Sequence, residues 1–425
     1  MSSPRVISPV DHLEGLMHVP GSKSISNRAL VCAALAGGES VIRNSSDSTD
    51  TGMMINGLNQ MGVLAVHSGD HLTVHGTGGR LYAPKYPIPV GNAGTTLRFL
   101  LSVAARATGT TVFEGSSRMA LRPITPLIDA LGELGVQVGF QRDTSRYVVT
   151  GGTLRGGESR VSGEQSSQFV SSLLLASPGL DRGLLLDVPG SLPSAPYVTM
   201  TIRVMSSFGA GVRVRESQFE VPAGTGYHAA AYQVEADASS ATYPFAAAAL
   251  CGGPVAVPHL AADSLQGDAG FLDVLARMGC QVHREGERVA VVRREALRGI
   301  DVDMNAMPDA VPALVAAALF AESPTRIRNV AHLRFKESDR LGTLAEELAQ
   351  IGADVRVTED GLDIHPVPLH GAQLDPHEDH RLAMMFALIG LRVPGIAVET
   401  PDCVAKSYPR FWDELARLST HQPST

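Results

Sequence analysis

Residues 55–66, INGLNQMGVLAV, decide the fold because the same pattern returns four more times along the chain. Each copy ends an amphipathic helix at a glycine and continues as an extended, alternating run that is typical of a strand. Successive helix-ending glycines lie 73, 74, 70 and 73 residues apart, at Gly62, Gly135, Gly209, Gly279 and Gly352. A sixth amphipathic helix, FWDELARL, occupies residues 411–418. With the strand-like runs between them, these segments predict six copies of a mixed α/β unit.

The length and composition favour two domains built from many short elements. The chain has 425 residues, more than one hydrophobic core usually serves, and it contains 43 glycines and 26 prolines. The pattern is interrupted near residue 234 and restarts with a strongly apolar helix at 239–252, whose N-cap is Asp237 or Ser239. We therefore expect two similar lobes of three units each, with a cleft between them that binds small molecules.

Charge and cysteine usage argue against several classes of protein. The net charge is −8, from 35 basic and 43 acidic residues, which disfavours a nucleic-acid partner. No apolar run reaches the ~18 residues that a membrane span needs, and no signal peptide is recognisable, so we expect a cytoplasmic protein without a membrane partner. The four cysteines are scattered without metal-ligand spacing and are expected to be buried thiols.

The segment PGSKSISNRAL, residues 20–30, has the features of an anion site where a strand gives way to a helix. Small residues let the backbone approach a ligand, and the free N–H groups of a helix start carry partial positive charge. Lys23 and Arg28 add two full charges. The segment does not match the Walker A pattern, and a capped helix start with two solvated cations is the alternative.

Three further segments of the first half place polar side chains at helix starts, where they could bind an anion or a polyol. The alternative in each case is an ordinary turn and helix cap. The residues concerned are Asn92, Gly94, Arg122, Ser166, Ser167, Gln168, Ser194 and Tyr197.

The second half contains the candidate acids. Asp309 lies at the mouth of a very apolar helix, where desolvation would raise its pKa and make it a usable base, although an N-cap aspartate is the commoner situation. The charge run at 334–340 contains Lys336, Glu337 and Arg340, and such a run is usually a solvated face. Arg381 enters another apolar helix.

Only four of the 35 basic residues are lysines, and three of them, Lys23, Lys336 and Lys406, fall in polar motifs. Lysine is a compact charge whose pKa can be shifted, so these three positions indicate a role in binding or catalysis. Lys85 is interpreted as a rare residue that is retained by chance, without a functional role. The acidic and histidine-rich segment 375–381 does not have metal-ligand spacing. We expect no metal and no cofactor.

Eight motifs occur in the order found in 5-enolpyruvylshikimate-3-phosphate synthases, which the chain resembles from about residue 5 to 418. They are PGSKSISNRAL, GNAGTTLR, RMALRPI, SSQF, DMNAMPDA, KESDRL, EDHRLAM and AKSYP. The resemblance implies an α/β fold, a two-lobed inside-out α/β barrel of six βαβαββ repeats, three per lobe, with helices inside and sheets outside. It also implies that residues 1–21 and 235–425 form one lobe and residues 22–234 an inserted lobe.

The implied reaction transfers the carboxyvinyl group of phosphoenolpyruvate to the 5-hydroxyl of shikimate 3-phosphate and releases phosphate, through a tetrahedral intermediate. This step belongs to the shikimate pathway of aromatic amino acid biosynthesis. Both substrates are polyanions, so a positive site is needed inside an acidic protein. The resemblance also implies that glyphosate occupies the phosphoenolpyruvate site beside Gly94. We expect the protein to act as a monomer.

The resemblance carries roles over to individual positions. Asp309 is the favoured base for the 5-hydroxyl, and Glu337 and Lys23 are candidates for proton transfer to and from the methylene and the phosphate. The residues implied to contact shikimate 3-phosphate, mainly in the inserted lobe, are Lys23, Ser24, Arg28, Ser166, Ser167, Gln168, Ser194, Tyr197, Asp309 and Lys336. Those implied to contact phosphoenolpyruvate are Lys23, Asn92, Gly94, Arg122, Gln168, Arg340, Arg381 and Lys406.

Two positions depart from the family pattern. His332 stands where Asn is common and is given no substrate contact, and Thr96 stands where many members have Ala, so we expect it to crowd the phosphate pocket slightly. Two other functions stay open. The sister enolpyruvyl transferase that acts on UDP-N-acetylglucosamine carries a loop cysteine, whereas this chain has none between 33 and 250. A non-catalytic anion-binding scaffold would have lost Asp309 and Glu337.

Overall fold

The computed structural model describes residues 3–69, 71–261 and 263–420 and divides the chain into two compact units. We call residues 1–20 with 235–425 the terminal unit, and residues 21–234 the inserted unit. Gly21, which the sequence analysis assigned with the terminal residues, belongs to the inserted unit. A Cβ atom at Gly21 would lie 1.7 Å from the carbonyl oxygen of Asn44, so the backbone packs directly on that unit.

The inserted unit contains three four-stranded sheets with one common topology. In each sheet the first two strands run parallel, and the second, third and fourth strands are antiparallel neighbours. The first sheet is β14 (Ala231–Gln233), β3 (Gly37–Arg43), β5 (His71–Thr77) and β4 (Leu64–Ser68). The second is β6 (Ile88–Gly91), β7 (Gly109–Gly115), β9 (Arg146–Gly151) and β8 (Gln137–Gln141). The third is β10 (Gly157–Arg160), β11 (Leu184–Asp187), β13 (Gln218–Val221) and β12 (Arg213–Arg215).

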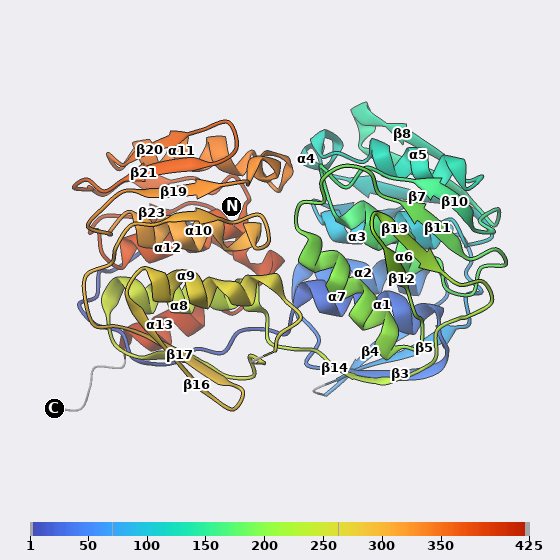
Figure 1. Ribbon diagram of the computed structural model, residues 1–425, viewed down its shortest axis with the longest axis horizontal. Coiled ribbons are helices and arrows are strands. Elements are labelled where there is room, and N and C mark those ends of the chain that lie inside the picture. The colour runs from blue at the N-terminus through green and yellow to red at the C-terminus, as the bar shows by residue number, and fades with distance from the viewer. Residues whose placement is uncertain (1–2, 70, 262, 421–425) are drawn as a thin grey trace. The chain divides into compact units, whose positions relative to one another are not determined.

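The helices of the inserted unit fall into an inner and an outer set (Figure 1). The inner helices are almost wholly buried, as expected of segments that are apolar on most sides. They are α1 (Lys23–Leu35), α3 (Gly94–Ala104) and α6 (Gln168–Ala176). The outer helices keep one exposed face, and they are α2 (Thr49–Gln60), α5 (Thr125–Glu133) and α7 (Ala195–Ser207). Two short helical segments, α4 (Ser117–Leu121) and η1 (Arg142–Thr144), complete the unit.

The terminal unit repeats this plan with one strand fewer. Its first sheet is β2 (Gly15–Leu16), β15 (Val255–Val257), β17 (Arg288–Arg293) and β16 (Cys280–Glu285). Its second sheet is β18 (Asp301–Asp303), β19 (Thr325–Arg328), β21 (Leu362–His365) and β20 (Asp354–Val357). Its third sheet has three strands, β22 (Gln373–Leu374), β23 (Ala397–Val398) and β1 (Arg5–Val6). The N-terminal segment thus supplies a strand to two sheets of this unit.

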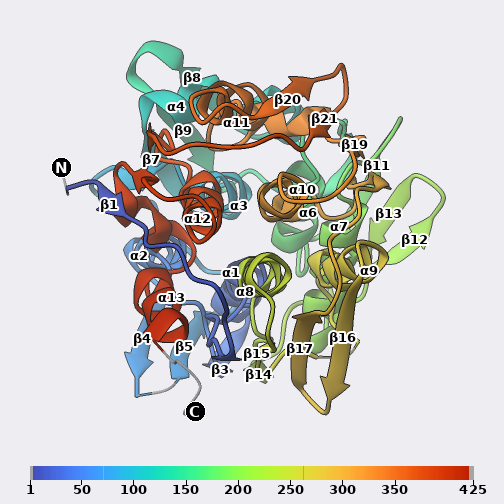
Figure 2. The same ribbon diagram turned by 90° about the vertical axis from the view of Figure 1, so that its left-hand side faces the viewer.

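The inner helices of the terminal unit form its hydrophobic core, and Figure 2 shows them inward of the strands. They are α8 (Ala238–Cys251), α10 (Val311–Ala318) and α12 (His380–Gly390), and every residue of the three is buried. Asp237 caps α8 by accepting a hydrogen bond from the N–H of Ser240 at 2.6 Å, which decides between the two expected caps. The outer helices are α9 (Phe271–Arg277), α11 (Arg340–Ala349) and α13 (Phe411–Thr420). The 3-10 segments are η2 (Gly267–Gly270), η3 (Pro308–Ala310), η4 (Ala331–Phe335) and η5 (Pro401–Lys406).

The expected fold class is confirmed. Six repeats are present, three in each unit, with buried helices inside and sheets outside. All five helix-ending glycines have positive φ, between +81° and +106°, which a residue with a side chain rarely adopts. In the described part of the chain, none of the helices combines the length and the apolar character that crossing a membrane would require.

Candidate active site

Arg28 links helices α1 and α7 of the inserted unit. Its Nε donates to Thr201 Oγ1 of α7 at 2.7 Å, its Nη1 to the Ser24 carbonyl of α1 at 2.8 Å, and its Nη2 to the Tyr197 carbonyl of α7 at 3.2 Å. The Arg28 side chain is only 1% exposed, and this burial lowers its pKa to about 10. The structure therefore brings Ser24, Arg28 and Tyr197 together, and Arg28 is not a solvated cation.

Lys23 is held by a carboxylate that the sequence analysis missed. Lys23 Nζ lies 3.1 Å from Asp50 Oδ2, and the two side chains are 12% and 5% exposed. Asp50 lies in the first turn of α2, 27 residues further along the chain, where no spacing linked it to Lys23. Thr96 also belongs to this contact, because its buried hydroxyl donates to the Asp50 carbonyl at 3.0 Å. The Thr96 hydroxyl thus joins α3 to α2, and the expectation that Thr96 crowds a phosphate pocket stays a prediction.

Gly94 and Arg122 fit against each other at the start of α3. Arg122 Nη1 donates to the Asn92 carbonyl at 3.0 Å and to Asn92 Oδ1 at 3.2 Å. A Cβ atom at Gly94 would lie 2.6 to 2.8 Å from three atoms of the Arg122 guanidinium. The N-cap residue of α3 is Ala93, whose side chain accepts no hydrogen bond. The Arg122 guanidinium and the positive N-terminal end of α3 therefore lie side by side at Gly94, and an anion there could interact with both.

Gln168 joins the second and third repeats of the inserted unit. Its Oε1 accepts from Arg98 Nη1 at 2.7 Å, and its Nε2 donates to Thr95 Oγ1 at 3.1 Å. Arg98 lies in the GNAGTTLR motif, but the sequence analysis gave it no contact of its own. Ser166 Oγ accepts from the Gln168 N–H at 3.3 Å. Two further predicted residues, Ser167 and Ser194, are buried N-cap residues of α6 and α7.

Asp309 is the centre of a second group, in the terminal unit. One carboxylate oxygen lies 3.5 Å from Lys336 Nζ and 3.3 Å from Arg340 Nη1, and the other lies 2.8 Å from Arg381 Nη2. The N-cap residue of α10 is Ala310, so the alternative of an ordinary N-cap aspartate is wrong. Three other predicted residues thus meet at this carboxylate.

The three cations around Asp309 decide its pKa. Burial alone would raise the pKa, but Arg381, Lys336 and Arg340 together hold it well below its ordinary value. The sequence analysis expected a raised pKa from the apolar helix that follows, and this expectation is wrong. The carboxylate is therefore ionised at neutral pH, the form that a base requires, and its proton affinity is reduced by its neighbours.

Arg340 has no exposed side-chain surface and is surrounded by three carboxylates. Besides Asp309, it contacts Glu337 Oε2 at 2.8 Å and both oxygens of Asp379, at 2.9 Å and 3.1 Å. Asp379 also caps α12 by accepting from the Arg381 N–H at 3.0 Å, a role that the sequence analysis missed. Lys336, Glu337 and Arg340 therefore do not form a solvated face. Three carboxylates and three cations meet in this group.

Lys406 completes the predicted set in the terminal unit, and His332 is the position to which the sequence analysis gave no substrate contact. His332 is buried in η4, and burial, assisted by the charges of Lys336 and Arg340, lowers its pKa to about 4. Lys406 is the last residue of η5, which packs against α12. It is half-buried. We refer below to two groups of residues. The Arg28 group, in the inserted unit, consists of Lys23, Ser24, Arg28, Asn92, Gly94, Arg122, Ser166, Ser167, Gln168, Ser194 and Tyr197. The Asp309 group, in the terminal unit, consists of Asp309, Lys336, Glu337, Arg340, Asp379 and Arg381.

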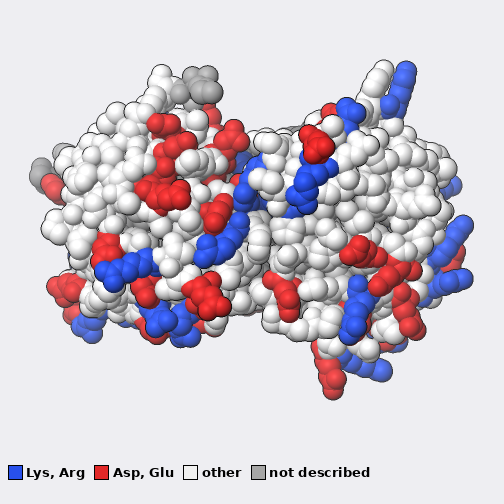
Figure 3. Space-filling view, turned by 90° about the horizontal axis from the view of Figure 1, so that it is seen from above, with Lys and Arg blue, Asp and Glu red and all other residues white. Residues whose placement is uncertain are grey.

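The acidic and histidine-rich segment 375–381 is engaged in other contacts. His377 Nε2 lies 3.2 Å from Glu347 Oε1, and Asp379 contacts Arg340. Among the described residues, no group of three or more His, Cys, Asp or Glu side chains could hold a metal ion. Over the face drawn in Figure 3, acidic and basic side chains stand in mixed groups, without one continuous basic field.

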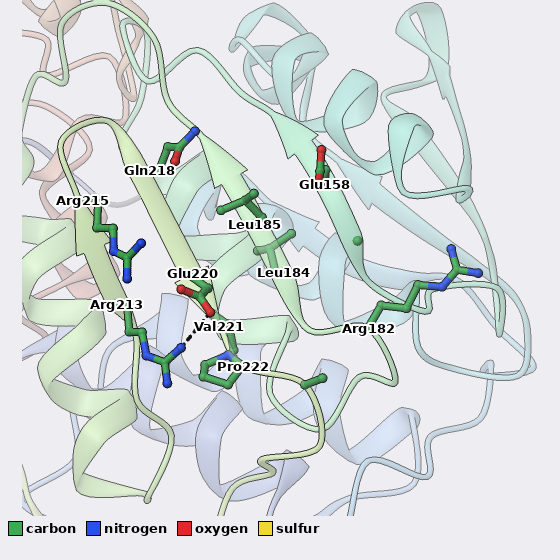
Figure 4. Close-up of a pocket in the computed structure, with 12 residues that line it drawn as sticks. Glu158, Arg182, Leu184, Leu185, Arg213, Arg215, Gln218, Glu220, Val221 and Pro222 are labelled. Carbon is green, nitrogen blue, oxygen red and sulfur yellow. Dashed lines mark hydrogen bonds and ion pairs between the residues drawn. The ribbon is translucent and has the colours of Figure 1, made fainter.

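A cavity of about 460 Å³ lies elsewhere, on the sheet formed by β10, β11, β13 and β12 (Figure 4). One charged pair lies across its strands, since Arg213 of β12 contacts Glu220 of β13 at 2.9 Å. None of the predicted site residues lines it. This cavity is therefore a solvent-facing hollow on the sheet, and the two groups described above contain the better candidate functional residues.

Comparisons with known proteins agree with the eight motifs. The family described as EPSP synthase (3-phosphoshikimate 1-carboxyvinyltransferase) matches residues 7–415. A 3-phosphoshikimate 1-carboxyvinyltransferase of Methanoculleus marisnigri is 43% identical, covering 96% of this chain and 98% of the relative. One of Trichormus variabilis is 39% identical, covering 98% of each. The solved EPSP synthase of Acinetobacter baumannii superposes with a TM-score of 0.81 at 27% identity, over 98% of both chains. The enolpyruvyl transferase NikO of Streptomyces tendae, with a TM-score of 0.79 at 21% identity, shares the fold.

Proposed function

Because the chain belongs to the EPSP synthase family, as a transferase of the shikimate pathway that moves a carboxyvinyl group onto shikimate 3-phosphate, we propose that the Arg28 and Asp309 groups perform this reaction. The observation that carries the proposal is the family match over residues 7–415, which includes every residue of both groups. The family uses phosphoenolpyruvate as the second substrate. The scaffold is not favoured, since Asp309 and Glu337 are present and in contact with cations, and the sister transferase is not favoured, since no cysteine lies between residues 33 and 250.

We assign the binding of shikimate 3-phosphate mainly to the Arg28 group. The support is that Arg28 itself contacts Ser24 and Tyr197, and that Ser166 contacts Gln168. Hydroxyl and amide side chains suit the hydroxyls of the ring, while Lys23 and Arg28 suit its anionic groups. The full proposed set is Lys23, Ser24, Arg28, Ser166, Ser167, Gln168, Ser194 and Tyr197, with Asp309 and Lys336 from the terminal unit.

We assign phosphoenolpyruvate to arginines of both groups. Arg122 lies against the glycine surface of Gly94 and the start of α3, where a carboxylate or phosphate can meet both the guanidinium and the helix N–H groups. The other proposed contacts are Lys23, Asn92, Gln168, Arg340, Arg381 and Lys406. Because Arg340 and Arg381 now hold Asp309, an incoming anion competes with that carboxylate for them.

This competition gives Asp309 its role as the base. When an anionic substrate draws the cations away, the pKa of Asp309 rises from its depressed value, and the carboxylate can accept the proton of the 5-hydroxyl. The hydroxyl oxygen then attacks the carbon of phosphoenolpyruvate that bears the phosphate, while the methylene carbon gains a proton from Glu337 or Lys23. Loss of a proton from the resulting methyl group expels phosphate and restores the double bond.

The assay that tests the proposal supplies purified protein with both substrates and measures phosphate and enolpyruvyl product together. The expected result is one phosphate for each product molecule, with no phosphate when shikimate 3-phosphate is replaced by UDP-N-acetylglucosamine. Absence of turnover with shikimate 3-phosphate would overturn the assignment and favour the anion-binding scaffold.

We also propose that the protein acts as a cytoplasmic monomer. The cytoplasmic location is supported by Cys32, Cys251, Cys280 and Cys403, which are all free thiols, as a reducing compartment would keep them. Light scattering on the purified protein should give the mass of one chain, 44.8 kDa. A mass of two chains at micromolar concentration would contradict the monomer.

A further inference from the structure

Arg28 is a buried cation whose hydrogen-bond partners are all neutral. Its acceptors are the hydroxyls of Thr201 and Ser171 and the carbonyls of Ser24 and Tyr197. Among the residues that the structure describes, no carboxylate lies within ion-pair distance of it. Arg340, the other wholly buried arginine, contacts three carboxylates. A buried charge without a counter-charge is costly, so Arg28 calls for an anion from outside the chain.

Two hydroxyl groups hold the guanidinium in place. Thr201 of α7 and Ser171 of α6 have no exposed surface, and their oxygens lie 2.8 Å apart. The Thr201 hydroxyl can donate to the Tyr197 carbonyl, also at 2.8 Å, which turns a lone pair toward Arg28 Nε. Ser171 Oγ accepts from Arg28 Nη2 at 3.4 Å. Because α1, α6 and α7 pack on one another, these contacts fix the guanidinium relative to three helices.

Because Thr201 and Ser171 are neutral acceptors, they leave the positive charge of Arg28 uncompensated. A carboxylate in either position would hold the guanidinium as firmly, but it would also cancel the positive charge that an anion needs. The contacts above occupy Nε, one N–H of Nη1 and both N–H groups of Nη2, out of the five that a guanidinium has. One N–H of Nη1 is left for a ligand. The arrangement fixes Arg28 without neutralising it.

We propose that Ser171 and Thr201 are positioning residues, which hold Arg28 as an unneutralised cation for an anionic group of shikimate 3-phosphate. The inference rests on the proposed function, in which Arg28 contacts this substrate. Neither hydroxyl has exposed surface, and both contact the guanidinium, so we infer that each acts through Arg28 and not directly on the substrate. Removal of either hydroxyl should therefore weaken the binding of shikimate 3-phosphate. It should leave kcat and the binding of phosphoenolpyruvate unchanged.

The decisive variant is Thr201→Val, which keeps the shape of the side chain and removes its hydroxyl. Loss of one hydrogen bond to a charged group predicts a rise of about tenfold in the KM for shikimate 3-phosphate. The kcat and the KM for phosphoenolpyruvate should stay near the wild-type values. Thr201→Ser should restore binding because it keeps the oxygen. Inhibition by shikimate, which lacks the phosphate, shows which anionic group Arg28 meets, since it weakens in Thr201→Val only if that group is the carboxylate.

Thr111→Val is the matched control in the same unit. Thr111 is equally buried in β7, and its hydroxyl has no hydrogen-bond partner, so its loss should change no kinetic constant.

A folded Thr201→Val with a wild-type KM for shikimate 3-phosphate, or with equal losses for both substrates and kcat, would overturn the proposal. If Thr201→Val does not fold, Ser171→Ala gives the same test with the same expected split. A wild-type protein that does not bind shikimate 3-phosphate in calorimetry refutes the proposed function itself, whereas a binding wild type with unaffected variants refutes only this inference.

Discussion

Asp309 owes its depressed pKa to side chains from distant parts of the sequence. Arg381, which contacts it at 2.8 Å, lies 72 residues away along the chain. The sequence shows that Asp309 precedes an apolar helix, and from this feature alone a raised pKa follows. Only the fold shows that Lys336, Arg340 and Arg381 converge on it. For the same reason the contacts of Asp50, Arg98 and Asp379 could not be predicted from the sequence. Most other members of the two groups could be predicted, because they are polar residues in the eight motifs.

Gly94→Ala tests the fit between Gly94 and Arg122. The sequence analysis placed glyphosate beside this glycine, and in the structure an added methyl group would first meet the Arg122 guanidinium, at 2.6 to 2.8 Å. Since the end of an arginine side chain can move, the protein should fold with an unchanged Tm, while Arg122 is displaced from the anion. We expect a higher KM for phosphoenolpyruvate and a higher inhibition constant for glyphosate. Equal constants in the two proteins would remove the steric explanation.

His332 should make the stability of the protein depend on pH between about 4 and 6.5. Its pKa is lowered to about 4 in the folded protein, so the unfolded chain binds the proton more tightly. Stability is therefore complete above pH 6.5 and decreases by up to about 3 kcal/mol as the pH falls to 4. In urea unfolding, His332→Gln should show a smaller decrease over this range than wild type. The exposed His259→Gln is the control and should keep the wild-type decrease; identical slopes for all three proteins would contradict the buried neutral imidazole.

At the level of the elements, a glycine at the end of five of the six outer helices was the most informative feature of the sequence. Its regular spacing predicted the repeats, because a left-handed residue ends each helix before the strand that follows. The pairing of strands that are far apart in the sequence could not be predicted in the same way. β14 pairs with β3 and β2 with β15, and both pairings join segments of two to seven residues from distant parts of the chain. Such short strands have no periodicity of their own.

Two glycines of the second repeat test the role of backbone conformation. Gly135 has φ +82° and Gly132 lies within α5, and a Cβ atom at either would have no neighbour within 4 Å. Gly135→Ala should therefore destabilise the protein by about 1 to 2 kcal/mol through backbone strain alone. Gly132→Ala should stabilise it by up to about 1 kcal/mol because alanine favours a helix. Denaturant unfolding measures both, and a change of the same sign in the two variants would contradict this account of the repeat.

At the level of the whole molecule, the two units share one plan but carry different chemistry. In the Arg28 group, Arg28 donates to neutral acceptors and Lys23 contacts Asp50, whereas the Asp309 group balances three carboxylates against three cations. The repeat in the sequence predicts the common plan, but it does not predict this difference, because the charged residues occupy different positions in each repeat. We propose that the reaction requires both groups, the first chiefly for shikimate 3-phosphate and the second for the proton.

The most direct test of this account compares wild type with Asp309→Asn in phosphate release and in binding of shikimate 3-phosphate. The amide keeps the shape of the side chain but cannot accept the proton of the 5-hydroxyl. We predict that the variant folds, binds shikimate 3-phosphate within a few-fold of wild type, and loses kcat by about 100-fold or more. Turnover close to that of wild type in a folded Asp309→Asn would contradict the central claim that this carboxylate is the base.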